Sequence, residues 1–135
     1  MDDASQKVAR VRLAEGFFKT VRLSAKSSEH DIRNAYSRLY YSFFHLGHVL
    51  LGRYYNHDEL PKRIRNTDAA LGQFVEALRK LRIEADYIPD IVSRQYSGNV
   101  EAYRVKAEQV LLEAEIQFDR MLKMCRRKGK PKRPK

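Results

Sequence analysis

The sequence predicts a single all-helical domain, built as an antiparallel bundle of four main helices. Four segments repeat apolar residues at three- and four-residue steps, the spacing that places side chains on one side of an α-helix. Only six glycines and four prolines occur in 135 residues, so few positions interrupt helical structure. Long helices of this kind must bury their apolar sides, and four of them can do so against one another.

The first predicted helix covers residues 4–21 and the second follows Ser28, a polar residue suited to an N-cap. Gly52 is the expected end of the second helix, because glycine readily ends a helix. The third helix opens near residue 67 and stops before Pro89. The fourth covers about 99–124. A short fifth helix at 58–64 is left open, and residues 90–98 are expected to be a connection.

Composition indicates where in the cell the protein works. The single cysteine, Cys125, forms neither an internal disulfide nor a cysteine-based metal site, which favours a reducing cytoplasm. The start of the chain is acidic and polar, unlike a signal peptide, and no apolar run approaches the roughly 18 residues of a membrane span. We therefore expect a cytoplasmic protein that does not enter the membrane.

The last ten residues hold most of the net charge of +10. We expect a folded domain over residues 1–125 and a disordered basic tail over 126–135, since the tail has no apolar residue. Arg126, Arg127 and Lys128, with the cations that follow them, would attract phosphate backbones without reading sequence. The alternative is a solubilising end, or a helix terminus that favours cations.

Two motifs carry a resemblance to a known family. Residues 40–45 read Tyr-Tyr-Ser-Phe-Phe-His and are followed by a Leu-Leu pair at 50–51, and Arg82 precedes an Ala-Asp-Tyr run at 85–87. His57 follows the second helix. Over residues 5–124 the chain resembles the HEPN family (higher eukaryotes and prokaryotes nucleotide-binding domain), in particular its small stand-alone prokaryotic members.

The resemblance implies a helical bundle that forms a homodimer, here through the face of the second helix. It also implies a toxin–antitoxin or defence system in which the partner is a minimal nucleotidyltransferase. Two activities are open. Some family members are metal-independent ribonucleases with an arginine followed, after four to six residues, by a histidine. Others lack that motif and bind a nucleotide or a protein partner.

Arg38 and His45 have the spacing of the ribonuclease motif. Seven helical steps place them on one face, about 10 Å apart along the axis. In the catalytic interpretation His45 moves the proton of a ribose 2′-hydroxyl and Arg38 holds the scissile phosphate. Leu39 departs from the polar residue that usually follows the family's arginine. In the alternative interpretation His45 only packs or hydrogen-bonds inside the bundle.

Further polar and aromatic residues share this helix. Asn34, Tyr41 and His48 lie on the same stripe as Arg38 and His45, and we predict that they contact the nucleic acid or nucleotide. The tyrosines at positions 36, 40 and 41 suit base stacking, the core or a dimer interface, and we favour the interface.

Other polar residues have structural interpretations. Arg82 and Asp86 are four residues apart, which predicts an ion pair at the end of the third helix with Tyr87 nearby. The polar run at 57–59 reads as a loop, so we predict no metal site. The sequence also has no phosphate-cradling glycine loop and no serine nucleophile motif, and we predict no cofactor.

Two functions follow. The first is an RNA- or nucleotide-binding HEPN protein that cleaves RNA without metal, through Arg38 and His45. The second is a non-catalytic module that binds a minimal nucleotidyltransferase or another protein.

Overall fold

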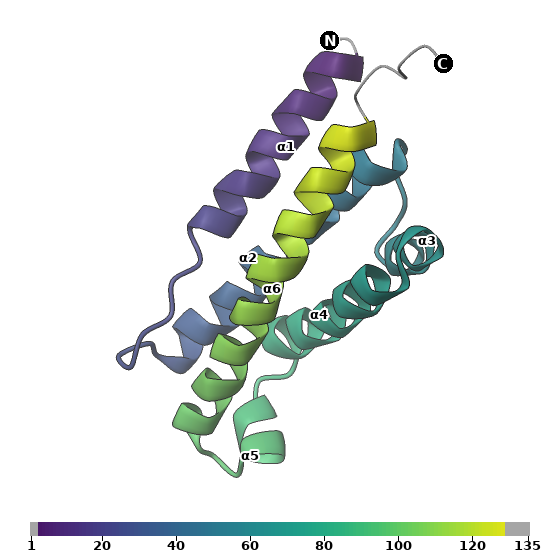
Figure 1. Cartoon of the computed structure of the whole chain (residues 1–135). Helices are drawn as coiled ribbons and strands as arrows, with labels where there is room; N and C mark the ends of the chain where they lie inside the picture. The colour runs from purple at the N-terminus through teal and green to yellow at the C-terminus, as the bar shows by residue number, and fades with distance from the viewer. Residues whose placement is uncertain (1–2, 129–135) are drawn as a thin grey trace, which may run out of the picture.

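The computed structural model describes residues 3–128, in which six helices and no strand form (Figure 1). The helices are α1 (Asp3–Lys19), α2 (Glu29–Leu51), α3 (Glu59–Thr67), α4 (Ala69–Tyr87), α5 (Ile91–Tyr96) and α6 (Val100–Lys128). The all-helical class is thus as predicted. None of the described helices is long and apolar enough to cross a membrane.

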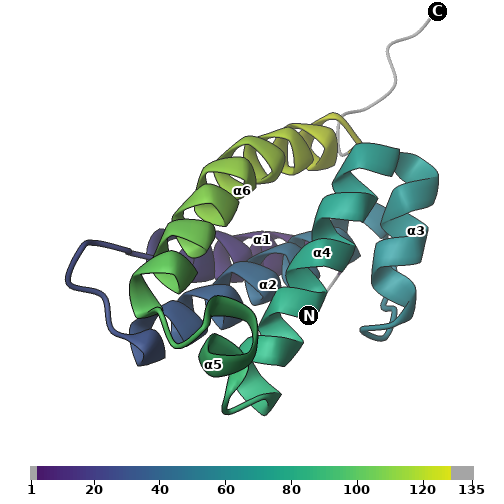
Figure 2. The same cartoon turned by 90° about the horizontal axis from the view of Figure 1, so that it is seen from below.

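The α2 helix lies at the centre and packs against α1, α4 and α6 (Figure 2). Its start is fixed by a capping box, in which Ser28 Oγ accepts from the Asp31 backbone and the Asp31 carboxylate accepts from the Ser28 backbone. Gly52 ends the helix in the left-handed conformation, with φ 74°. Both ends therefore lie where the sequence predicts them.

Aromatic pairs show how the long helices run relative to α2. Tyr36 contacts Tyr103 and Phe43 contacts Phe118, so α2 and α6 run in the same direction. Phe43 also contacts Phe74, near the start of α4, and α4 runs against α2. With α1 also running against α2, the direction of the four long helices alternates in chain order (Figure 1).

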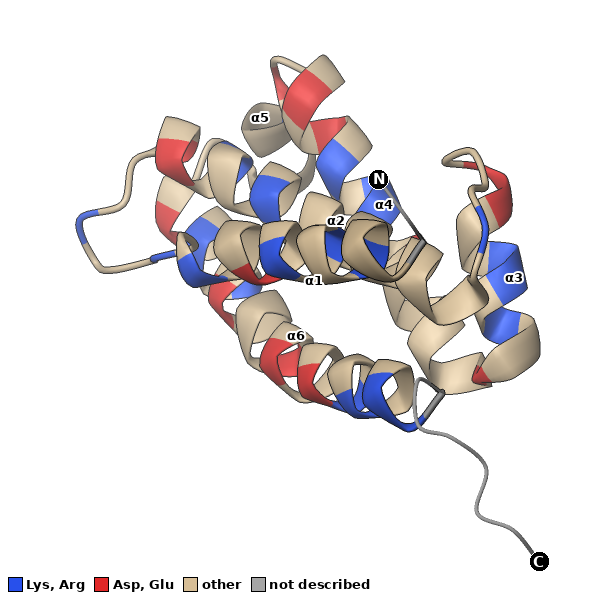
Figure 3. Cartoon of the chain, turned by 90° about the horizontal axis from the view of Figure 1, so that it is seen from above, with Lys and Arg blue, Asp and Glu red and all other residues tan. Residues whose placement is uncertain are grey.

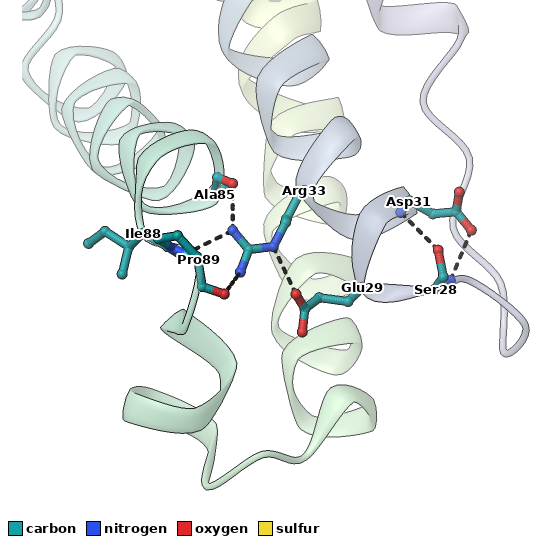
Figure 4. A network of polar contacts seen from close by, with 7 residues as sticks. All are labelled: Ser28, Glu29, Asp31, Arg33, Ala85, Ile88 and Pro89. Carbon is teal, nitrogen blue, oxygen red and sulfur yellow. Dashed lines mark hydrogen bonds and ion pairs between the residues drawn. The ribbon is translucent and has the colours of Figure 1, made fainter.

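Arg33 joins the first turns of α2 to the end of α4 (Figure 4). Its guanidinium donates to the carbonyls of Ala85, Ile88 and Pro89 at 2.7, 3.1 and 2.9 Å, and Nε pairs with Glu29 at 3.0 Å. The last carbonyls of a helix have no partner within the helix, and Pro89 cannot continue α4. Arg33 therefore supplies the missing donors and holds the C-terminal end of α4 against the first turns of α2.

Two boundary predictions are wrong. Residues 91–96 form α5, where a connection was predicted, because Ile91 and Val92 bury their side chains in the core. The predicted tail begins too early: residues 126–128 continue α6, since no helix breaker precedes Gly129 and cations are favourable in a last turn. The rest of that tail lies outside the described residues. The short helix left open at 58–64 is present as α3.

The predicted interface role of two tyrosines needs correction. Tyr36 and Tyr40 are fully buried inside one copy of the chain, so neither forms an interface with a second copy or stacks on a base. The chain's own helices α1, α4 and α6 cover the apolar side of α2. A homodimer through the second helix stays a prediction, and it would use the side of α2 that the chain's own helices leave accessible, without Tyr36 or Tyr40.

Candidate nucleic-acid interface

Three hollows lie in a row along the side of α2 that faces α1 and the loop after it. The first, near the start of α2, shares Asn34 and Arg38 with the middle one, and the third lies at the end of α2. We call this row the α1–α2 groove. The α2 residues that line it recur every three or four positions, which is why one side of a single helix forms its floor.

The middle hollow gathers four of the predicted site residues. It has a volume of about 440 Å³ and is lined by Phe17, Asn34, Ser37, Arg38, Tyr41 and His45. All but Phe17 come from α2, and Phe17 comes from the end of α1. The helical spacing that the sequence shows therefore does place Arg38 and His45 on one accessible wall.

His45 is half-buried at this wall. Its ring stacks on Phe17, with centroids 5.8 Å apart and planes 7° from parallel. Burial lowers the pKa of His45, and the positive charges of Arg10 and His48 lower the pKa further. The ring is therefore neutral at pH 7, the form in which an imidazole nitrogen can accept a proton.

Arg38 is exposed, and the loop that follows α1 holds its side chain in place. Its Nη1 donates to Thr20 Oγ1 at 2.9 Å. No ion pair joins Arg38 to any carboxylate of the residues that the structure describes. The guanidinium keeps donors available for an anion in the hollow.

Tyr41 lies between Arg38 and His45 on α2, and a residue of α4 holds its side chain. Arg82 donates to the Tyr41 hydroxyl at 3.0 Å, and its guanidinium lies over the Tyr41 ring at 5.2 Å. Arg82 also pairs with Asp86 at 2.8 Å, as their spacing predicts, and contacts the ring of Tyr87. Arg82 thus holds the Tyr41 hydroxyl, and the half-buried Tyr41 ring also packs against Phe17, Phe44 and His57 at the wall of the hollow.

His48 is placed differently from His45. It is only 4% exposed, and its Nε2 lies 2.8 Å from the carbonyl oxygen of Tyr55. It lines the third hollow, not the middle one, with its ring parallel to that of Tyr54. His48 therefore orients the segment after α2 and does not line the middle hollow with Arg38 and His45, so its predicted contact with the ligand stays a prediction.

His57 also has a packing role. Its Nδ1 lies 2.6 Å from the Tyr40 hydroxyl, and its ring stacks on Phe44 with centroids 4.3 Å apart. Burial lowers the pKa of His57. Within the described part of the chain, no three His, Cys, Asp or Glu side chains gather as metal ligands would.

The charge of the groove is strongly one-sided. Its lining includes the following ionised residues: the cations Lys7, Arg10, Arg22, Arg38 and Arg53, and the carboxylate Asp31. The Ser28 backbone bond holds Asp31 in the α2 cap and lowers its pKa. The ion pairs of residues 4–127 all use other cations, so the groove's positive charge is uncompensated there.

The distribution can be followed in Figure 3. Basic positions recur along α1 and on α2 behind it, whereas α6 carries several acidic positions before its basic end. Arg126 and Arg127 are exposed at that end, which lies at the same end of the molecule as the start of α1 (Figure 1). The side chain of Lys128 lies outside the described ones.

Sequence reasoning missed the α1 side of the groove. Phe17, Lys7 and Arg10 line it, as do Arg53 and Tyr54 from the segment after α2. The spacing of Lys7, Arg10 and Phe17 is helical and would have placed them on one face. Nothing local to α1 shows that this face meets α2 beside His45.

No family model, curated protein or solved structure matches the chain. The HEPN assignment therefore stays a prediction that the motif residues alone support.

Proposed function

We propose that the protein is a HEPN-type domain that binds single-stranded RNA in the α1–α2 groove. The observation that carries the proposal is a set of five cations along one groove that form no ion pair with a carboxylate of residues 4–127. Phosphate backbones supply matching negative charge at regular intervals, and release of their counterions favours binding.

The aromatic residues of the groove favour a single strand over a duplex. Phe17 and Tyr41 line the middle hollow beside Arg38, and Tyr54 lines the third hollow beside Arg53. Single strands offer phosphates and unstacked base faces together, and proteins bind them with cations and aromatic rings side by side. Asn34 Nδ2 lies 3.2 Å from His30 Nε2, and the amide oxygen of Asn34 adds an acceptor for a base or a 2′-hydroxyl.

A specific observation favours a second activity, cleavage of the bound RNA. Neutral His45 shares one hollow with Arg38, which forms no ion pair within residues 4–127. His45 accepts the proton of a 2′-hydroxyl as that oxygen attacks the adjacent phosphorus, and Arg38 stabilises the charge on the phosphoryl oxygens. The bond to the 5′-oxygen breaks, a 2′,3′-cyclic phosphate forms, and the leaving oxygen takes a proton from water.

Binding is tested by fluorescence anisotropy with a labelled 20-nucleotide RNA that has no secondary structure. Arg38→Gln removes one groove cation, and Arg94→Gln, at an exposed position on α5, is the matched control. The proposal predicts weaker binding for the first variant and unchanged binding for the second. Equal affinities for wild type and Arg38→Gln would contradict it.

Cleavage is tested in EDTA by gel analysis of the same RNA. Products ending in 2′,3′-cyclic phosphate, absent with His45→Ala, would support the second activity. Intact RNA with tight binding leaves a binding domain only. If the wild-type chain does not bind RNA, the groove is better explained as a docking face for a protein, such as the minimal nucleotidyltransferase that the family resemblance implies.

A further inference from the structure

The third hollow of the groove has an aromatic ring in an unusual position. Tyr54 lies two residues after Gly52, the α2 stop, and is 63% exposed. Its ring lies parallel to that of His48, with centroids 4.8 Å apart and planes 3° from parallel. Exposing so much of a tyrosine forgoes most of the free energy that its burial would contribute.

The ring of Tyr54 is nevertheless held in a fixed orientation. His48 supports one side, and His48 itself is buried and contacts the Tyr55 carbonyl through Nε2. Phe44 packs edge-on against both rings, at centroid distances of 4.5 Å to His48 and 6.4 Å to Tyr54. Tyr54 is therefore a supported ring, with its exposed area available to a flat partner.

Cations line the same hollow as this ring, and no acid of residues 4–127 lines it. The hollow has a volume of about 280 Å³ and is lined by Gln6, Lys7, Arg10, His48, Val49, Gly52, Arg53 and Tyr54. Lys7, Arg10 and Arg53 form no ion pair with a carboxylate of residues 4–127. Arg53 is positioned over the Tyr55 ring, 4.9 Å from its centroid.

We propose that this hollow is a base-stacking subsite for RNA, in which a nucleobase stacks on Tyr54 and the adjoining phosphates contact Lys7, Arg10 and Arg53. The inference rests on the proposed function, because it places a second contact point for the same strand. It adds that the ligand is an oligonucleotide, not a mononucleotide.

The distance between the two contact points sets the length of RNA that reaches both. Arg38 and Gly52 are fourteen residues apart on or at the end of α2, which corresponds to about 21 Å along the helix. A stacked strand rises about 3.4 Å per nucleotide, so roughly six nucleotides join the two hollows. Shorter oligonucleotides reach only one of them.

Another tyrosine of the chain provides a matched control. Tyr87 is 67% exposed, close to the value for Tyr54, but it lies at the end of α4 and outside the groove. The Arg82 guanidinium lies over its ring at 5.5 Å. Tyr87→Ala therefore removes an exposed ring of the same kind without changing the hollow.

The test measures affinities for single-stranded RNAs of three and twelve nucleotides with wild type, Tyr54→Ala, Tyr54→Phe and Tyr87→Ala. Stacking on an aromatic side chain contributes about 1–3 kcal/mol per base, which corresponds to roughly 5- to 150-fold in affinity. We expect Tyr54→Ala to weaken binding of the 12-mer by a factor in this range. Tyr54→Phe and Tyr87→Ala should bind it like wild type.

The readouts separate failure of the subsite from failure of the proposed function. If Tyr54→Ala binds the 12-mer as wild type does while Arg38→Gln binds it less tightly, the subsite is wrong and RNA binding in the groove stands. If neither substitution changes the affinity, both are wrong. A fluorescent purine analogue in the 12-mer adds a direct signal: its quenching should be lost in Tyr54→Ala and kept in Tyr54→Phe. Circular dichroism checks that Tyr54→Ala is folded.

Discussion

Arg38 and His45 line one hollow on the α1 side of α2, with Tyr41 between them. Their chemistry is complementary: Arg38 is an exposed cation without an ion pair in the described chain, and His45 is a half-buried ring that burial keeps neutral. An anion held at Arg38 lies beside a group that can accept a proton. The RNA-cleavage proposal depends on this juxtaposition.

The pH dependence of cleavage should report His45. Its pKa is lowered from 6.5, and the neutral ring is the form that accepts a proton. We therefore expect the rate to rise with pH along a limb whose midpoint lies below 6.5, and to be level from pH 7 to 8. A single-turnover profile of wild-type protein measures this. A midpoint above 7 would show that His45 is not the group that titrates.

Protein stability should fall in mild acid, because burial lowers the pKa of His45, His48 and His57 in the folded state. The unfolded chain then binds more protons than the folded one below pH 6.5, the ordinary histidine value. The contribution is fully present above pH 6.5 and is lost as the pH falls below it. Urea unfolding at pH 7.5 and pH 5.5 tests this. Equal free energies of unfolding at the two pH values would contradict the prediction. The His48→Asn variant should show a smaller difference between the two pH values than wild type does.

Replacing Arg33 should destabilise the fold without touching the groove. Arg33→Met keeps the apolar stem but leaves the carbonyls of Ala85, Ile88 and Pro89 without their donor. Hydrogen bonds from charged donors are worth about 1.5–3 kcal/mol, so we expect the free energy of unfolding to fall by about 2 kcal/mol or more. Urea unfolding measures it, with Arg94→Met, at an exposed position on α5, as the control. A change below about 0.5 kcal/mol, the size of an ordinary surface effect, would refute the role given to Arg33.

The sequence predicted well what is decided locally. The capping box at Ser28 and the stop at Gly52 involve neighbouring residues, and both are found where their chemistry indicates. The predicted face of α2 is also real, because helical geometry alone places Arg38 and His45 in line. These features need no knowledge of the partner helices.

What could not be predicted depends on how helices pack. Periodicity places Tyr41 on the stripe of Arg38 and His45, but it does not show whether Tyr36 and Tyr40 are buried by this chain's own helices or by a second copy. The Arg33 bonds join residues more than fifty positions apart. The six-residue α5 is too short to show a helical repeat.

The central claim is that RNA binds to the cations of the α1–α2 groove, and the salt dependence of binding tests it most directly. Each phosphate contact on a single strand contributes about 0.7 to the slope of log affinity against log salt. We predict that Lys7→Gln/Arg10→Gln/Arg38→Gln has a slope about 2 smaller than wild type, whereas Lys106→Gln on α6 changes it little. An unchanged slope in the triple variant would contradict the account.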